Sequence, residues 1–169
     1  AVADAHSLEA AGDRILAPLA DGALASASRP WRGLVALDGN LTEALLAEVA
    51  ASPLFDAADL RVAPASPGKA TRLAPLLGHP GATVYLNRVE AGLICGALFA
   101  DAPAAARALV ERGARRVLVT DGAAPVAEAR ADGTLVAMAP PPVAVCRVTG
   151  AGDCLMASHI AAEAAGLAP

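Results

Sequence analysis

The chain has 169 residues, of which 56% are hydrophobic, and its 17 acidic and 13 basic residues give a formal net charge of −4. This length and apolar content predict one globular domain with a buried core and exclude a disordered chain. The mild acidity excludes a basic surface for nucleic acid or an anionic membrane, and 2% aromatic residues are too few for single-strand stacking platforms. We therefore expect a small-molecule partner, with no nucleic acid and no membrane.

The cysteines and histidines do not have the spacing of a metal site. Cys95, Cys146 and Cys154 form no CxxC pair, and the three histidines are scattered. The opening "AVADAHSLEA" lacks the basic and apolar segments of a secretory signal, and the uncharged stretch 134–146 is shorter than the ~20 residues of a membrane helix. These features predict reduced thiols in a soluble, cytoplasmic protein.

Short β-branched or aliphatic runs alternate with alanine- and leucine-rich stretches along the chain. The runs predict strands over 33–38, 59–64, 82–87, 115–120 and 133–139, and the stretches between them predict helices over 42–51, 69–77, 89–98 and 104–112. This alternation indicates an α/β fold of the Rossmann type, with a mostly parallel sheet and helices on both faces. From 117 to 138 we expect a strand, a turn and antiparallel pieces rather than another βαβ unit.

Both ends of the chain look incomplete for such a fold. The opening "AVAD" is strand-like, and a helix runs to the last residue, Pro169. A doubly wound sheet usually has further strands at its edges. We therefore predict a single partial α/β domain over residues 1–169.

The segment "TGAGD", residues 149–153, has the residue types of an anion-holding turn. Gly150 and Gly152 allow backbone N–H groups to point into one concavity, and the following helix adds its positive end. Asp153 then lies in the first turn, where its carboxylate can accept a proton from an attacking hydroxyl, an arrangement that suits phosphoryl transfer. The alternative is a tight strand-to-helix turn in which Asp153 only complements the helix dipole.

Three further side chains are candidates for contact with phosphate. Asp38 and Asn40 follow a predicted strand on the side where parallel sheets bind ligands, although they could equally form an Asx turn with their own backbone. Lys69 ends "SPGK", which is not a P-loop because Ala63 and Ala70 replace the required glycine and hydroxyl residue. Lys69 is therefore either a phosphate contact or a solvated surface lysine.

Several segments read in order resemble the ribokinase-like, or PfkB, carbohydrate kinases. "VTGAGD" (148–153) resembles their second signature, "NRVE" (87–90) their NxxE motif, and "VLVTDGAAPV" (117–126) the strand and turn that receive the adenine nucleotide. The succession of "LDGNL" (37–41), "APASPGKATRL" (63–73) and "YLNRVEAGLICG" (85–96) is most similar to the pseudouridine kinase branch. The resemblance covers nearly all of the chain.

The resemblance implies a role for each matching residue. Asp153 would be the base that deprotonates the acceptor hydroxyl, with Gly150, Ala151 and Gly152 as the anion hole. ATP would donate its γ-phosphoryl group to a primary hydroxyl of a sugar or nucleoside, with pseudouridine favoured over the substrates of ribokinase, fructokinase or adenosine kinase. A non-catalytic nucleotide-binding module is the alternative from another class.

The resemblance also implies sites for the nucleotide and for magnesium. Thr120 and Gly122 would border the nucleotide, although a plain strand-ending turn uses the same residues. Asn87 and Glu90 would organise Mg²⁺ through its waters. Without a metal, the same pair is a capping pair at a helix start.

Other features of the family have no match in this chain. These are the N-terminal strands, the Gly-Gly sugar-contact motif, the β lid over the substrate and the helices that follow "GAGD". The resemblance implies a homodimer through that lid. His159 is interpreted as a packed or surface residue, and the arginines at 107, 112, 115 and 116 as a solvated face.

Overall fold

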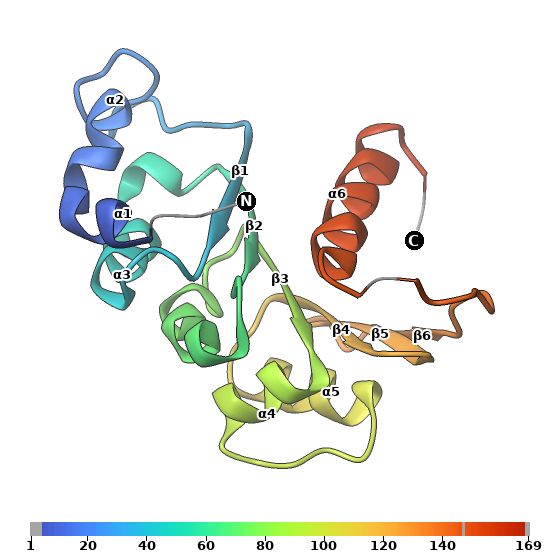
Figure 1. The fold of residues 1–169 in the computed structure, drawn as a ribbon. Coiled ribbons are helices and arrows are strands. Elements are labelled where there is room, and N and C mark those ends of the chain that lie inside the picture. The colour runs from blue at the N-terminus through green and yellow to red at the C-terminus, as the bar shows by residue number, and fades with distance from the viewer. Residues whose placement is uncertain (1–4, 147, 168–169) are drawn as a thin grey trace.

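The computed structural model describes residues 5–146 and 148–167, and its centre is a six-stranded sheet in the order β1-β2-β3-β4-β5-β6 (Figure 1). The strands are β1 (Leu34–Asp38), β2 (Asp59–Ala63), β3 (Ala82–Asn87), β4 (Arg116–Asp121), β5 (Ala124–Arg130) and β6 (Leu135–Met138). The first four are parallel, and β5 and β6 are antiparallel. The predicted mostly parallel sheet, with antiparallel pieces after 117, is confirmed.

The helices that connect the parallel strands lie on one face of the sheet. They are α3 (Glu43–Ala51) with η2 (Pro53–Phe55), then η3 (Pro67–Leu76), and then α4 (Arg88–Cys95) with α5 (Ala102–Glu111). Each connection advances one place in the same direction, and right-handed crossovers then put every connecting element on the same side. Helix α6 (Ala151–Ala164) lies on the opposite side of the sheet from α4 and α5 (Figure 1).

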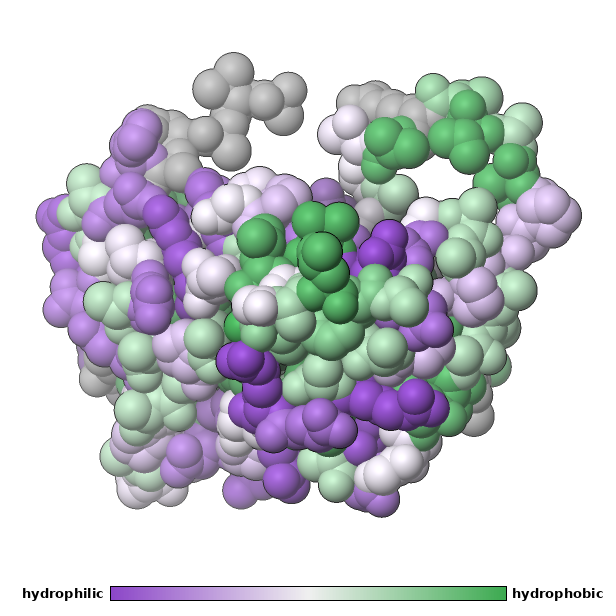
Figure 2. Space-filling model, turned by 90° about the horizontal axis from the view of Figure 1, so that it is seen from below, coloured by the Kyte–Doolittle hydropathy of each residue, from purple (hydrophilic) through white to green (hydrophobic). Residues whose placement is uncertain are grey.

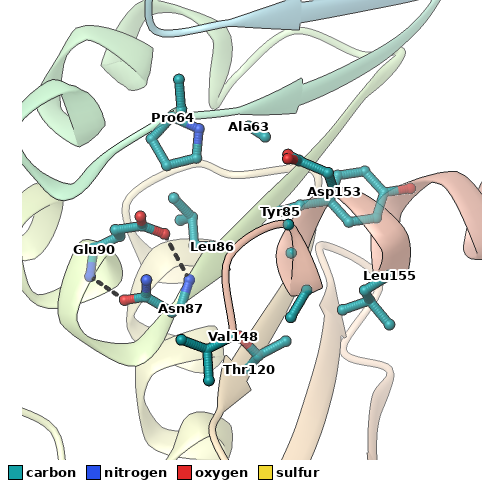
Figure 3. Close-up of a pocket in the computed structure, with 14 residues that line it drawn as sticks. Ala63, Pro64, Tyr85, Leu86, Asn87, Glu90, Thr120, Val148, Asp153 and Leu155 are labelled. Carbon is teal, nitrogen blue, oxygen red and sulfur yellow. Dashed lines mark hydrogen bonds between the residues drawn. The ribbon is translucent and has the colours of Figure 1, made fainter. Parts of the chain in front are cut away.

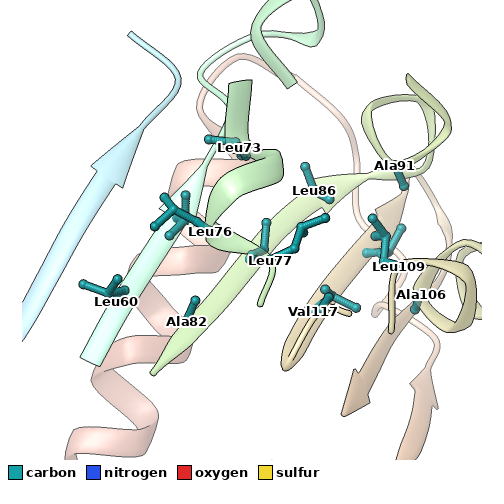
Figure 4. Close-up of a cluster of buried hydrophobic side chains, with 14 of the residues drawn as sticks. Leu60, Leu73, Leu76, Leu77, Ala82, Leu86, Ala91, Ala106, Leu109 and Val117 are labelled. Carbon is teal, nitrogen blue, oxygen red and sulfur yellow. The ribbon is translucent and has the colours of Figure 1, made fainter. Parts of the chain in front are cut away.

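The hydrophobic core lies between the sheet and these connecting helices (Figure 4). Leu60 of β2, Val84 of β3 and Val117 of β4 are fully buried and point to this side. Leu73 of η3 and Leu109 of α5 pack against them from the helical layer. The alternate residues of the same strands face α6, because side chains in a strand point to opposite faces in turn.

Local sequence signals explain where the helices begin and end. Thr42 caps α3 as expected, since its hydroxyl accepts the N–H of Leu45 at 3.2 Å. The helix predicted over 69–77 is instead the 3-10 helix η3, which contains Pro75. Proline has no N–H and clashes with the carbonyl four residues back, which disfavours an α-helix there.

The N-terminal region contains helices that the sequence pattern did not indicate. These are α1 (Ala5–Ala11), the 3-10 helix η1 (Gly12–Leu16) and α2 (Ala17–Ala20). Their alanine-rich sequence shows no clear apolar periodicity, which is the signal used for helices. The strand-like "AVAD" at 1–4 lies outside the described residues.

Figure 2 shows an apolar area on the face seen from below in Figure 1. Val89 and Leu93 of α4 and Leu98 of the following loop are exposed apolar side chains that line one hollow, and Leu98 is fully exposed. Within the described ranges, no helix has both the length and the apolar character to cross a bilayer.

A buried histidine gives the fold a defined dependence on pH. His79 is almost fully buried, and its Nδ1 accepts the N–H of Gly81 at 3.2 Å. Burial lowers the pKa of His79 below the ordinary 6.5 and outweighs the opposing charge of Asp56. Well above pH 6.5 the imidazole of His79 is neutral in both the folded and the unfolded chain. Below it the unfolded chain binds a proton that the folded chain does not, so stability falls as the pH falls.

We expect the free energy of unfolding, measured by urea titration, to decrease from pH 7.5 to pH 5. His79→Asn keeps a hydrogen-bond acceptor but cannot titrate, so its stability should decrease less over the same interval. The matched control is His6→Asn, because the side chain of His6 is 97% exposed. An identical pH dependence in wild type and His79→Asn would contradict the assignment.

Candidate active site

A cavity of about 320 Å³ opens at the carboxyl ends of β2, β3 and β4, where α6 begins (Figure 3). It brings together seven of the residues predicted to form the site: Asn87, Glu90, Thr120, Gly150, Ala151, Gly152 and Asp153. This is the edge of a parallel sheet at which ligands bind in α/β folds. Sequence segments more than sixty residues apart therefore meet in one hollow.

The first turn of α6 leaves backbone donors available to the cavity. Gly150 is the N-cap with φ +86°, a left-handed conformation that glycine adopts without strain, and it provides no side-chain cap. The N–H of Ala151 donates to the carbonyl of Val148 at 3.1 Å, while no described residue accepts the N–H groups of Gly152 or Asp153.

The other long helices have side-chain caps at their first turns. The N-caps of α3, α4 and α5 are Thr42, Asn87 and Asp101, and each of these side chains accepts a backbone N–H. The start of α6 is therefore suited to an external anion.

Asp153 is positioned to act on a group bound at that helix end. Its side chain is exposed and extends into the cavity towards Ala63 and Pro64 at the end of β2 (Figure 3). No ion pair of Asp153 is formed within the described chain. A carboxylate with this freedom can accept a proton from a hydroxyl in the cavity.

Asn87 and Glu90 form a complete capping box at the start of α4. The side chain of Asn87 accepts the N–H of Glu90 at 2.9 Å, and Oε2 of Glu90 accepts the N–H of Asn87 at 2.8 Å (Figure 3). The capping alternative is thus realised, and it fixes both side chains at the cavity wall. Burial raises the pKa of Glu90 against the lowering effect of its hydrogen bonds to Asn87.

Thr120 and Gly122 line two different cavities that adjoin each other. Thr120 is the register partner of Asn87 in the β3–β4 pairing and lines the first cavity. Gly122 lies in the β4–β5 turn and lines a second, mainly apolar cavity of about 960 Å³, together with Pro140 and Val143. Val148 and Ala151 line both cavities, so the two spaces adjoin at the start of α6.

Asp38, Asn40 and Lys69 form a separate group that does not line the cavity. Asp38 accepts the backbone N–H of Asn40 at 2.9 Å and its side-chain amide at 2.7 Å, as in an Asx turn. Nζ of Lys69 then donates to Oδ1 of Asn40 at 2.5 Å. Their predicted contact with phosphate stays a prediction, and the observed bonds serve the local turn.

The cavity has further lining residues that were not predicted as site residues. They include Tyr85 of β3, Leu155 of α6 and the segment 63–65. Tyr85 lies two residues before Asn87, so the strand alternation places both on one face. Leu155 lies two residues after Asp153 and carries no comparable signal.

The described part of the chain contains no group of three or more His, Cys, Asp or Glu side chains arranged to hold a metal ion. Near the cavity wall, Glu90 supplies one carboxylate, and one of its oxygens is already bonded to the backbone. Mg²⁺ readily keeps several of its waters and is often bound by one or two carboxylates plus phosphates. The residues therefore fit a water-mediated magnesium site rather than a direct one.

Glu90→Gln separates the capping role from the metal role. Glutamine also completes a capping box, so the melting temperature should change little. Loss of the charge should raise the Mg²⁺ concentration that gives half the maximal rate of phosphoryl transfer by about tenfold or more. Glu43→Gln, in the exposed first turn of α3, is the matched control. A lower melting temperature with an unchanged dependence on Mg²⁺ would contradict a role of Glu90 in magnesium binding and leave it as a helix cap alone.

Comparisons with known proteins show the family and the fold. The family profile described as "pfkB family carbohydrate kinase" matches residues 30–168. No curated protein matches the chain. Among solved structures, a carbohydrate kinase from Agrobacterium tumefaciens is 27% identical with a TM-score of 0.73, over 99% of this chain and 51% of its own.

Two more distant structures share the fold. A ribokinase from Arabidopsis thaliana, complexed with ribose and ATP, is 19% identical with a TM-score of 0.62, over 80% of this chain and 44% of its own. An adenosine kinase from Sinorhizobium meliloti is 17% identical with a TM-score of 0.62, over 80% of this chain and 43% of its own. The chain thus spans about half the length of these solved structures.

Proposed function

Because the chain belongs to the pfkB family of carbohydrate kinases, we propose that it is the nucleotide-binding, catalytic portion of an ATP-dependent kinase whose acceptor is a primary hydroxyl of a ribosyl compound. The observation that carries the proposal is the uncapped start of α6, with free N–H groups and the Asp153 carboxylate facing one cavity. That arrangement offers an anion site beside a base, which phosphoryl transfer requires.

The two adjoining cavities suggest how ATP lies in the site. The apolar cavity beside Gly122 suits the adenine base, and the start of α6 suits the phosphates. Thr120 lines the cavity at the start of α6. Magnesium, when bound, neutralises part of the phosphate charge and orients the phosphates, and Asn87 and Glu90 would hold it through its waters.

The reaction requires the protein to accept one proton from the acceptor hydroxyl. The acceptor oxygen bonds to the γ-phosphorus as the bond to the ADP oxygen breaks, and the Asp153 carboxylate takes the proton of the acceptor hydroxyl. The N–H groups of Gly152 and Asp153 stabilise the charge on the transferring group from fixed positions. Tyr85 and Leu155 line the same cavity beside the start of α6.

Pseudouridine is the favoured acceptor, with pseudouridine 5′-phosphate as the product. The segments that resemble the pseudouridine kinase branch contribute residues 63–65, 85–87 and Glu90 to the cavity lining, which supports this choice. We propose that the complete protein is cytoplasmic and forms a homodimer through the lid.

A panel of acceptors tests the function in the complete protein. We expect ADP release to depend on the acceptor, with the highest kcat/KM for pseudouridine and phosphate on the 5′ oxygen of the product. A higher kcat/KM with ribose, fructose or adenosine would replace the acceptor but keep the kinase. ATP binding without phosphoryl transfer to any acceptor would instead support a non-catalytic module.

A further inference from the structure

Helix α6 carries the proposed base, yet it is held on the sheet by polar contacts. None of its residues is fully buried, unlike α3, α4 and α5. Leu155, His159 and Glu163 are spaced four residues apart, so they form one stripe along the helix. The strand side chains that meet this stripe include Arg61, Tyr85 and Arg116, and Glu128 of β5 lies 4.0 Å from His159.

Glu163 bridges two arginines from different strands. Its Oε2 lies 2.6 Å from Nη1 of Arg61 on β2, and its Oε1 lies 2.6 Å from Nη1 of Arg116 on β4. The carboxylate therefore spans β3 on the α6 side of the sheet, with one oxygen on Arg61 and the other on Arg116. Partial burial opposes ionisation, but Arg116 and Arg61 outweigh it and hold the pKa of Glu163 below its usual range.

His159 connects the same helix to the wall of the cavity. Its Nδ1 lies 2.8 Å from Oη of Tyr85, and its Nε2 lies 3.2 Å from Nη2 of Arg116. Arginine can only donate, so Nε2 accepts and Nδ1 carries the proton that is donated to Tyr85. Arg61 also donates to Oη of Tyr85, at 3.0 Å. Tyr85 lines the cavity that contains Asp153, so these bonds reach the site itself.

Arg116 has a different role from the one its sequence context indicated. The prediction of a solvated arginine face is wrong for this residue, because its side chain is only 16% exposed and pairs with Glu128 and Glu163. Arg116 lies on the strand face opposite the hydrophobic core. Removing one partner from such a buried charge group leaves the other charges uncompensated, which is costly.

We propose that Glu163 and His159 are positioning residues that fix the register of α6 on the sheet and thereby set the place of Asp153. This inference rests on the proposed function, in which Asp153 is the base. The helix rises about 1.5 Å per residue, so His159 and Glu163 hold it roughly 9 and 15 Å from Asp153. Two fixed points along one rigid helix define where its first turn lies.

A double-mutant cycle between Glu163→Gln and Asp153→Asn tests the inference in the complete protein. Glu163→Gln keeps the shape but removes the charge, so α6 can shift. We expect kcat to fall by about 10- to 100-fold, as small misplacements of a catalytic group cost, with the KM for ATP within about twofold of wild type. In the Asp153→Asn background the same change should have no further effect on kcat, because no base remains to be positioned.

The controls separate this role from loss of folding. Glu111→Gln, an exposed carboxylate at the end of α5, should leave kcat unchanged. If Glu163→Gln does not fold, Glu163→Asp, which keeps the charge on a shorter side chain, takes its place in the cycle. A full further loss of kcat in the Asp153→Asn background overturns the positioning role while the proposed function stands. An unchanged kcat in Asp153→Asn alone overturns both.

Discussion

Replacing Asp153 with asparagine should lower kcat by roughly 10²- to 10⁴-fold, the range that general acid–base catalysis contributes. Asparagine has nearly the same shape but cannot accept the proton of the acceptor hydroxyl. Asp153 is exposed and forms no ion pair among the described residues, so the melting temperature should stay close to that of wild type. The effect should therefore fall on the chemical step alone.

The measurement is ADP release under saturating ATP and acceptor, with circular dichroism and thermal melting as checks on the fold. Asp13→Asn is the control, because Asp13 is an exposed acid in the first turn of η1, away from the cavity. ATP affinity should change little, since the anion site is built from backbone N–H groups. An unaltered kcat with intact ATP binding would exclude Asp153 as the base.

Replacing Gly39 with alanine should destabilise the protein by about 2–3 kcal/mol, as overpacking at a close contact does. A Cβ at this position would lie about 2.4 Å from the carbonyl oxygen of Pro64 by the backbone geometry, and 3.0 Å from Cβ of Lys69. The N–H of Gly39 also donates to the carbonyl of Ala63 at 3.1 Å. The end of β1 and the segment 63–65 must therefore move apart, and that segment borders the cavity.

Urea unfolding measures the loss of stability, and kcat/KM should fall as well because the cavity wall is displaced. Gly68→Ala is the matched control. A Cβ on Gly68 would have nothing within 4 Å, and its φ is not in the left-handed region. Equal stabilities of Gly39→Ala and Gly68→Ala would show that β1 and Pro64 can separate freely.

The sheet could be predicted from the sequence because its strands are short apolar runs bounded by turn residues. The runs 82–87 and 115–120 match β3 and β4 to within one residue. The spacing of apolar residues does not separate a 3-10 helix from an α-helix, so the type of η3 did not follow from the pattern, although Pro75 disfavours an α-helix there. The N-terminal helices have no periodic signal, so local pattern could not identify them.

The candidate site could be predicted in part for a similar reason. Gly150, Gly152 and Asp153 are contiguous in one motif, and Asn87 and Glu90 are three residues apart, so local spacing is informative. The polar group under α6 joins residues 61, 85, 116 and 163, which no local window contains. Its existence follows from the strand register and from the place of α6 on the sheet.

The contrast between the two sides of the sheet has a consequence for how the protein responds to its solvent. Concentrated sulfate strengthens the burial of apolar groups, whereas dissolved ions screen attractions between opposite charges that water can reach. Added sulfate therefore strengthens the leucine- and valine-rich layer, whereas it weakens the ion pairs of Glu163 only to the extent that water reaches this carboxylate, which is 23% exposed. Added ammonium sulfate can raise the temperature at which the domain melts while it loosens the part that carries the reaction, so thermal resistance and turnover need not rise together.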